Sequence, residues 1–306
     1  MKQKKTMLLL CGALATLLCC YGGLAVWNDH QKEQAEAEEE ASKIYLVDAE
    51  DLTAVSYTDG ESTLGFVEED GTWYDTADKE IPMNQEVVGG FADTVASLSA
   101  KRELKDPDDV ADYGLDAPAY TISYTTKDGE EGAVYIGDMT GEDYYAMVEG
   151  SDRIYTISDD LPYSMDFDLS GYIQKDTVPS ISSGNLKKVE VTENGATTAF
   201  EDEDDLGELA GGWGTLTLTE LADYHVTDDT LADYGLDEAS RITAVAEYED
   251  TDTGDEESFT VYLGSTDENG NRYVMVDDSV LVYTVSSSVA DNMITVEETA
   301  DNETSD

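Results

Sequence analysis

Ala111-Asp112-Tyr113-Gly114-Leu115-Asp116 is a stretch that occurs twice, since it returns unchanged as Ala232-Asp233-Tyr234-Gly235-Leu236-Asp237. We call these two stretches the signature. Further matches follow downstream: residues 135–137 (YIG) correspond to 262–264 (YLG), and residues 154–158 (IYTIS) correspond to 282–286 (VYTVS). Matches in the same order and at similar spacing indicate a duplicated module, and two copies make tandem domains.

The signature has the chemistry of a helix C-terminus. We expect a short helix, N-capped by Asp106 or Thr227, to stop at the glycine, which takes the left-handed conformation readily. The leucine that follows would pack back on the helix, as in a Schellman motif. A ligand site formed by Asp112 and Asp116 is the competing interpretation, and capping explains the pattern better. The residues that define this structural signature are Tyr113, Gly114, Leu115, Asp116, Tyr234, Gly235, Leu236 and Asp237.

Antiparallel strands are expected to fill most of both modules. Residues 120–125 alternate apolar and polar side chains, and Asp128-Gly129 predicts a hairpin turn into residues 133–136. Other turn signals are Asp59-Gly60, Asp70-Gly71, Glu149-Gly150, Asn194-Gly195 and Asn269-Gly270. The predicted fold class is therefore α+β and β-rich: two tandem modules of antiparallel sheet with short capped helices, behind one N-terminal transmembrane helix.

One longer helix is expected in the first module, with Asn84 as its N-cap. Its apolar face would consist of Val87, Val88, Phe91, Val95 and Leu98. The second module offers no counterpart to this helix between Trp213 and Thr227, so we expect this module to be a shortened copy.

Residues 7–27 (MLLLCGALATLLCCYGGLAVW) carry no charge. A helix of this length spans about 31 Å, which matches the hydrocarbon core of a bilayer. Lysines precede the segment and acidic residues follow it, so the positive-inside rule places the N-terminus in the cytoplasm and the rest outside. A retained signal-anchor is the favoured interpretation, a lipid anchor at Cys19 or Cys20 is the second, and a signal peptide cleaved near residues 23–25 is the third.

The domain limits follow from these features. We expect a cytoplasmic basic tip (1–6), a transmembrane signal-anchor (7–27), an acidic helical stalk (28–43), a first module (44–172), a linker (173–185), a second, shorter module (186–294) and a disordered acidic tail (295–306).

The charge of the chain restricts its partners. With 16 basic and 70 acidic residues, the net charge is −54. Such a field repels nucleic acid, so nucleic-acid binding is excluded as a function. All three cysteines lie within the N-terminal apolar segment, so neither a disulfide nor a catalytic cysteine is available downstream.

The sequence shows no pattern typical of catalysis. The histidines His30 and His225 are isolated, and no nucleophile elbow, phosphate loop or dinucleotide fingerprint occurs. We therefore predict no catalytic, cofactor-binding or metal site, and no cofactor. The acidic runs 201–205 and 267–271 are candidates for calcium, although neither has the EF-hand order. The strand tyrosines are expected to pack across strands, with a stacking platform for glycan as the alternative; they are Tyr120, Tyr124, Tyr135, Tyr144, Tyr145 and Tyr155.

Several of these motifs resemble the DUF4340 family, a bacterial domain of unknown function. The resemblance is carried by Trp73-Tyr74, by Ile81-Pro82-Met83-Asn84, by the run that ends at Asp116, and by residues 136–157. The second copy lacks the Trp73 and Pro82-to-Asn84 section. The resemblance implies an N-terminal membrane segment and an accessory role beside transporters of the ATP-binding-cassette (ABC) type related to gliding machinery, and it supplies no catalytic residue.

The function that these observations favour is that of a membrane-anchored, extracytoplasmic, non-enzymatic envelope protein that binds a protein partner in an ABC-type transporter system. The alternative is a surface protein that binds glycan or a divalent cation.

Overall fold

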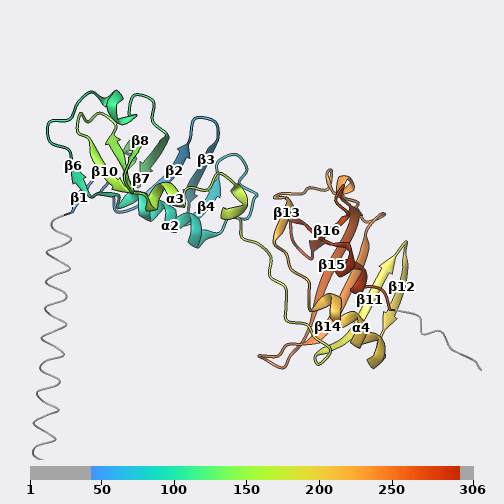
Figure 1. Cartoon of the computed structure of the whole chain (residues 1–306). Coiled ribbons are helices and arrows are strands. Elements are labelled where there is room, and N and C mark those ends of the chain that lie inside the picture. The colour runs from blue at the N-terminus through green and yellow to red at the C-terminus, as the bar shows by residue number, and fades with distance from the viewer. Residues whose placement is uncertain (1–42, 297–306) are drawn as a thin grey trace, which may run out of the picture. The chain divides into compact units, whose positions relative to one another are not determined.

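The protein is described by a computed structural model that covers residues 43–296 (Figure 1). An eight-stranded sheet, a seven-stranded sheet and a two-stranded ribbon dominate it, and the helices are few and short. The class is therefore α+β and β-rich, as predicted. No helix within residues 43–296 has both the length and the apolar character that crossing a bilayer requires. The expected transmembrane segment (7–27), the stalk up to residue 42 and the tail from residue 297 lie outside the described residues.

The eight-stranded sheet has the strand order β4-β3-β2-β7-β8-β9-β10-β6. Its elements, in chain order, are β2 (Leu52–Thr58), β3 (Thr63–Glu69), β4 (Thr72–Asp75), α2 (Gln85–Ala96), β6 (Arg102–Glu103), the 3-10 helix η1 (Val110–Tyr113), β7 (Tyr120–Thr126), β8 (Glu131–Thr140), β9 (Asp143–Val148), β10 (Tyr155–Ser158), α3 (Asp160–Ser164) and the 3-10 helix η2 (Leu169–Tyr172). The separate ribbon pairs β1 (Ile44–Tyr45) with β5 (Ser99–Ala100).

The seven-stranded sheet has the strand order β12-β11-β14-β15-β16-β17-β13. Its elements are β11 (Leu186–Glu193), β12 (Ala196–Phe200), α4 (Glu203–Trp213), β13 (Glu220–Asp223), the 3-10 helix η3 (Leu231–Tyr234), β14 (Ile242–Glu249), β15 (Glu256–Thr266), β16 (Asn271–Val276), β17 (Val282–Ser286) and α5 (Ser287–Asn292).

The two sheets repeat one succession of elements. In each, a hairpin leads to a helix, an edge strand and a 3-10 helix, and four antiparallel strands follow with a short helix at the end. The pairs β2 and β11, β3 and β12, β6 and β13, and β7–β10 and β14–β17 hold equivalent places in the two strand orders. Among the strands of these two sheets, only β4 lacks an equivalent.

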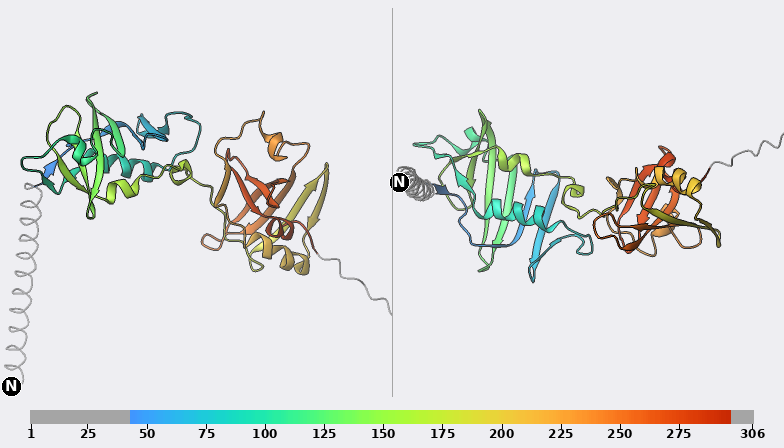
Figure 2. Two further views of the ribbon diagram at one scale, coloured as in Figure 1. Left: turned by 45° about the horizontal axis from the view of Figure 1, so that its top comes forward. Right: turned by 90° about the horizontal axis from the view of Figure 1, so that it is seen from below.

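Helix α2 lies along one face of the eight-stranded sheet (Figure 2). The Oδ1 atom of Asn84 accepts a hydrogen bond from the Val87 amide at 3.2 Å, so the expected N-cap is confirmed. Val88, Phe91 and Val95 are buried as expected, but Val87 is 42% exposed. The prediction for Val87 was wrong because its neighbour Val88 occupies the sheet-facing position and the two adjacent residues cannot share it.

Helix α4 corrects a second expectation, because the second sheet does have a counterpart of α2. The acidic run that precedes it forms its N-terminus: Asp202 is the N-cap, and its carboxylate accepts a hydrogen bond from the Asp204 amide. Acidic residues in the first turn are favoured by the helix dipole, so a run that looks like a cation site in sequence is a helix start. Trp213, 1% exposed, ends the helix in the core and donates from Nε1 to the Met293 carbonyl at 3.1 Å.

The turns follow the sequence closely. The glycines of all the expected turn pairs have positive φ, and the Asn194-Gly195 pair (φ 51° and 78°) joins β11 to β12.

Residues of the expected linker are hydrogen-bonded. The Gln174 amide donates to the Pro82 carbonyl, and Asp176 Oδ2 accepts from the hydroxyls of Tyr283 and Ser279.

Candidate functional site

The two signature stretches form the same turn in their respective sheets. In each stretch a 3-10 helix ends at a left-handed glycine: Gly114 at φ 70° in the first copy and Gly235 at φ 67° in the second. The Leu115 and Leu236 amides donate to the carbonyls of Val110 and Leu231 at 3.0 and 2.9 Å, which is the 6→1 bond of a Schellman motif. Both leucines are buried.

The N-caps of these helices differ from the expectation. Asp106 has φ 49°, which is incompatible with the extended backbone of an N-cap, and Asp109 caps η1 by accepting from the Ala111 amide. In the second copy Thr230 takes the cap position, and Thr227 forms the turn before it. The helix is shorter than expected because it starts later in both copies.

Each signature turn rests on a strand glycine from the downstream match. A Cβ atom at Gly137 would overlap the carbonyl oxygen of Tyr113, and one at Gly264 would overlap that of Tyr234. The signature tyrosines also pack edge-on against strand tyrosines: the ring centroids of Tyr113 and Tyr145 lie 4.8 Å apart. Those of Tyr234 and Tyr273 lie 5.0 Å apart. The repeated motifs therefore contact one another within each sheet.

The aspartates of the signature lie at the surface. Asp112 and Asp116 are exposed, and Asp237 accepts a hydrogen bond from the Ser240 hydroxyl at 3.1 Å. The strand tyrosines pack as expected: Tyr144 and Tyr155 are buried, and the rings of Tyr120 and Tyr144 make an edge-on contact at 6.4 Å.

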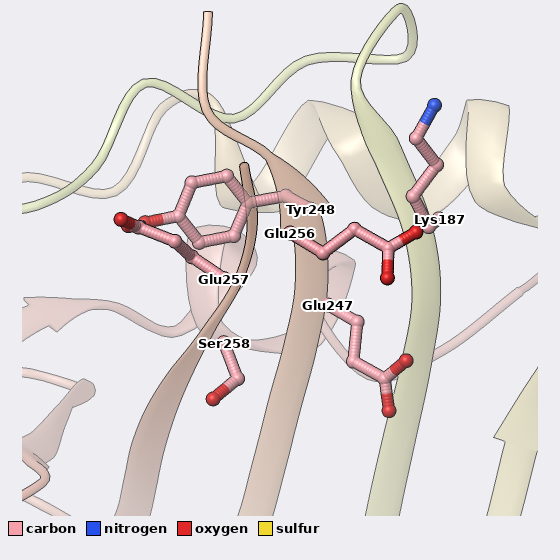
Figure 3. Close-up of a pocket in the computed structure, with 6 residues that line it drawn as sticks. All are labelled: Lys187, Glu247, Tyr248, Glu256, Glu257 and Ser258. Atoms are coloured by element: carbon pink, nitrogen blue, oxygen red, sulfur yellow. The ribbon is translucent and has the colours of Figure 1, made fainter. Parts of the chain in front are cut away.

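A shallow polar depression of about 340 Å³ lies at one end of the seven-stranded sheet. It is lined by residues of β11, β14 and β15: Lys187, Glu247, Tyr248, Glu256, Glu257 and Ser258. Figure 3 shows the Tyr248 ring and the Glu257 carboxylate together on one side of the strands, and Glu247 and Glu256 on the other. Strand alternation places successive side chains on opposite faces.

A hydrogen bond and an ion pair position side chains of this depression. Tyr248 donates its hydroxyl to Glu257 Oε2 at 2.8 Å, and burial together with this bond raises the pKa of Tyr248 to about 12. The phenol is therefore protonated at neutral pH and acts as a donor. Lys187 Nζ lies 3.3 Å from Oε2 of Glu249, the last residue of β14. Excess carboxylate gives this depression the chemistry to attract a cation or an ammonium group.

A second depression, of about 480 Å³, lies on the same sheet near the Asn194-Gly195 turn. Its cation is Arg241, whose guanidinium carbon lies 3.9 Å from the centre of the Tyr262 ring. Tyr262 in turn donates its hydroxyl to Asp277 at 2.8 Å. Arg241 is not among the residues expected from the sequence, although a basic residue four positions after the signature in so acidic a chain was a usable signal.

The expected cation candidates serve the local fold. The run 201–205 starts α4, and Asp267 accepts hydrogen bonds from the Asn269 and Asn271 amides at 2.9 and 2.7 Å. Within residues 43–296 no group of three or more acidic, histidine or cysteine side chains is placed to hold a metal ion. His30 lies outside the described residues, and the His225 amide donates to Asp223 at 3.0 Å.

Comparison with protein families identifies the domain. The model of the DUF4340 family, a domain of unknown function, matches residues 73–223. The chain contains a DUF4340 domain. The match confirms the resemblance seen in the sequence. The DUF4340 match starts in β4, includes the first signature and the linker, and ends in β13.

Other comparisons add little to the DUF4340 assignment. No curated protein matches the chain. Among solved structures, a thioesterase-like protein from Clostridium sporogenes is 14% identical, with a TM-score of 0.28 over 39% of this chain and 99% of that one. A likeness this weak carries no argument about fold or activity.

Proposed function

We propose that this protein is a membrane-anchored, extracytoplasmic component of the bacterial envelope that binds a protein partner and is not an enzyme. Its two sheets would be tandem copies of one module (44–172 and 186–294), held behind a single transmembrane helix formed by residues 7–27. The observation that carries the proposal is the repeated order of elements in the two sheets, which supports a duplicated scaffold. Duplicated scaffolds offer two related surfaces for one assembly.

The nature of the partner follows from the family resemblance. The resemblance to DUF4340 implies a place beside ABC-type transporters, and the apolar segment 7–27 would place this chain in the same membrane. The strongly acidic exported part favours a partner whose facing surface is basic, because complementary charge speeds and orients association.

The test is affinity purification of the tagged full-length protein from gently solubilised native membranes, read by mass spectrometry. Recovery of a transporter permease and its ATPase in stoichiometric amounts supports the proposal. Recovery of the protein alone, under conditions that keep other membrane complexes intact, overturns it. Intact-mass measurement of the same sample distinguishes a retained helix from a lipid attached at Cys19 or Cys20.

A second function, binding of a divalent cation at the surface, is favoured by one observation. Glu247 and Glu256 lie on the same side of the strands in one depression, which a single lysine, Lys187, also lines. Millimolar calcium would then raise the melting temperature more than magnesium does, and Glu256→Gln would abolish the difference. An equal effect of both ions would indicate charge screening alone.

A further inference from the structure

The strand β12 lies at an edge of its sheet, whereas its equivalent in the other sheet does not. In the eight-stranded sheet β3 is flanked by β2 on one side and β4 on the other. In the seven-stranded sheet β12 is flanked by β11 alone, because the hairpin that would supply a β4 equivalent is absent and the chain passes from Phe200 into α4. We call the outer side of residues 196–200 the open edge.

The helices beside these strands can be aligned residue by residue. Buried positions 88, 91, 92 and 95 of α2 recur at the same spacing in α4 as 206, 209, 210 and 213. The N-caps Asn84 and Asp202 fall in the same register. This alignment makes Gly89 of α2 equivalent to Gly207 of α4.

The two equivalent glycines differ in what covers them. A Cβ atom at Gly89 would lie 3.7 Å from Trp73 Nε1, so the tryptophan of β4 lies over the helix at this glycine. At Gly207 a Cβ atom would meet nothing within 4 Å, and the residue is exposed. The second module therefore keeps the glycine against which an aromatic side chain packs, without the strand that supplies it.

The open edge has the chemistry of a strand-pairing surface. Residues 196–200 (ATTAF) carry no charged residue and no proline. Natural edge strands use charged residues and prolines to prevent pairing with another strand. The positive φ values of Asn194 and Gly195 define a two-residue hairpin closed by the Glu193–Ala196 pair. Because hydrogen-bonded and non-hydrogen-bonded pairs alternate from there, Thr197 and Ala199 direct their backbone groups outward.

Charge around the open edge selects the partner. Glu193 precedes the hairpin, and residues 201–205 (EDEDD) follow β12 directly. A second copy of this chain would bring an equally acidic surface against it, which like-charge repulsion disfavours. A strand with basic flanks is complementary.

We propose that the open edge of β12 and the Gly207 face of α4 together accept an extended segment of a partner protein by strand addition. The segment carries an aromatic side chain that packs over Gly207, where Trp73 packs over Gly89 in the first module, and basic residues that face residues 201–205. This proposal names the surface through which the proposed function would be performed. It rests on the proposed function for the identity of the partner. Main-chain hydrogen bonds supply the affinity in such complexes, and side-chain pockets supply the specificity.

Binding of a synthetic peptide to the full-length protein tests this directly. The probe is Lys-Thr-Trp-Tyr-Ser-Ser-Val-Thr-Lys, which copies the start of β4 between lysines, with its binding followed by calorimetry. Thr197→Pro removes an outward N–H without removing a hydrogen bond to β11, and is expected to weaken binding at least about tenfold. Thr197→Val keeps the N–H and is expected to bind as the parent protein does.

A second pair of variants tests the aromatic contact. Gly207→Leu covers the helix face and is expected to weaken binding by a similar factor. Gly211→Leu is the matched control, because Gly211 is also exposed with nothing within 4 Å. Far-ultraviolet circular dichroism checks that all four variants fold.

The outcomes separate the two proposals. Absence of binding at millimolar peptide, or equal binding by Thr197→Pro and Thr197→Val, overturns the inference. If the native partner still co-purifies with both the Thr197→Pro and the Gly207→Leu proteins, the proposed function stands and the open edge is not its surface. A dimer that Thr197→Pro dissociates would show that a second copy is the occupant, which also overturns the inference.

Discussion

Gly264 lies directly against the carbonyl oxygen of Tyr234, so that a Cβ atom on the glycine would overlap this oxygen. The same relationship joins Gly137 to Tyr113 in the other sheet. Two motifs that the sequence repeats separately are thus one packing unit, in which a signature turn is seated on a strand of its own sheet.

Alanine at either strand glycine tests this unit. Gly264→Ala and Gly137→Ala are each expected to lower the free energy of unfolding by about 3 kcal/mol, because backbone must move to admit the methyl group. Hydrogen exchange read by mass spectrometry locates the effect, which should be confined to the sheet that carries the substitution. Gly211→Ala, at an exposed helix position with open space around it, should raise stability by up to about 1 kcal/mol. An equal effect of all three would contradict the packing argument.

Substitution should distinguish the glycine that ends a signature helix from a glycine in an ordinary turn. Gly235 and Gly254 both have positive φ, but a Cβ atom at Gly235 would lie 2.7 Å from the Ser265 amide nitrogen, while Gly254 has open space. Asparagine tolerates the left-handed region, so Gly254→Asn should be nearly neutral. Gly235→Asn should cost about 2 kcal/mol in urea unfolding because of the close approach. An equal loss of unfolding free energy in the two variants would show that the positive φ alone determines the effect, which would contradict the role of the close approach.

Sequence patterns predicted the class, the turns, the left-handed glycines that end the signature helices and most of α2, because each depends on local chemistry. They missed α4, since Gly207, Gly211 and Gly212 weaken its helical propensity and its acidic first turn resembles a cation site. The sequence shows that the Trp73 section is missing from the second copy. Only the strand order shows that this leaves β12 at an edge. The Arg241–Tyr262 contact joins the residue before β14 to a residue of β15, so no local pattern could place it.

Replacing the buried hydroxyl of Thr156 is expected to stabilise the protein. Thr156 is fully buried in β10, and its Oγ1 has no hydrogen-bond partner within the described part of the chain. Thr156→Val should raise the free energy of unfolding by about 1 kcal/mol, because valine removes an unsatisfied polar group at nearly constant volume. The equivalent residue of the second sheet, Thr284, is partly exposed, and Thr284→Val should change stability by less than about 0.5 kcal/mol. Thermal melts followed by circular dichroism measure both, and destabilisation by Thr156→Val would contradict the assignment.

The signature tyrosine of the second copy predicts a pH dependence. Burial and a hydrogen bond to Asp223 raise the pKa of Tyr234 to about 12. The folded state therefore favours the protonated phenol, so its contribution is fully present below the ordinary tyrosine pKa of about 10 and is lost as pH rises towards 12. Urea unfolding between pH 8 and 11.5 should show stability falling less steeply in Tyr234→Phe than in the parent protein. Parallel curves would contradict the prediction.

Photo-crosslinking in native membranes tests whether a partner strand binds at the open edge of β12. Benzoylphenylalanine replaces Thr197 in β12 in one full-length protein, and Thr253 in the exposed turn after β14 in another. If a strand is added there, position 197 forms a discrete adduct with one polypeptide, and this adduct is absent when the crosslinker is at position 253. No adduct from position 197 above the level seen at position 253 would contradict strand addition at the open edge.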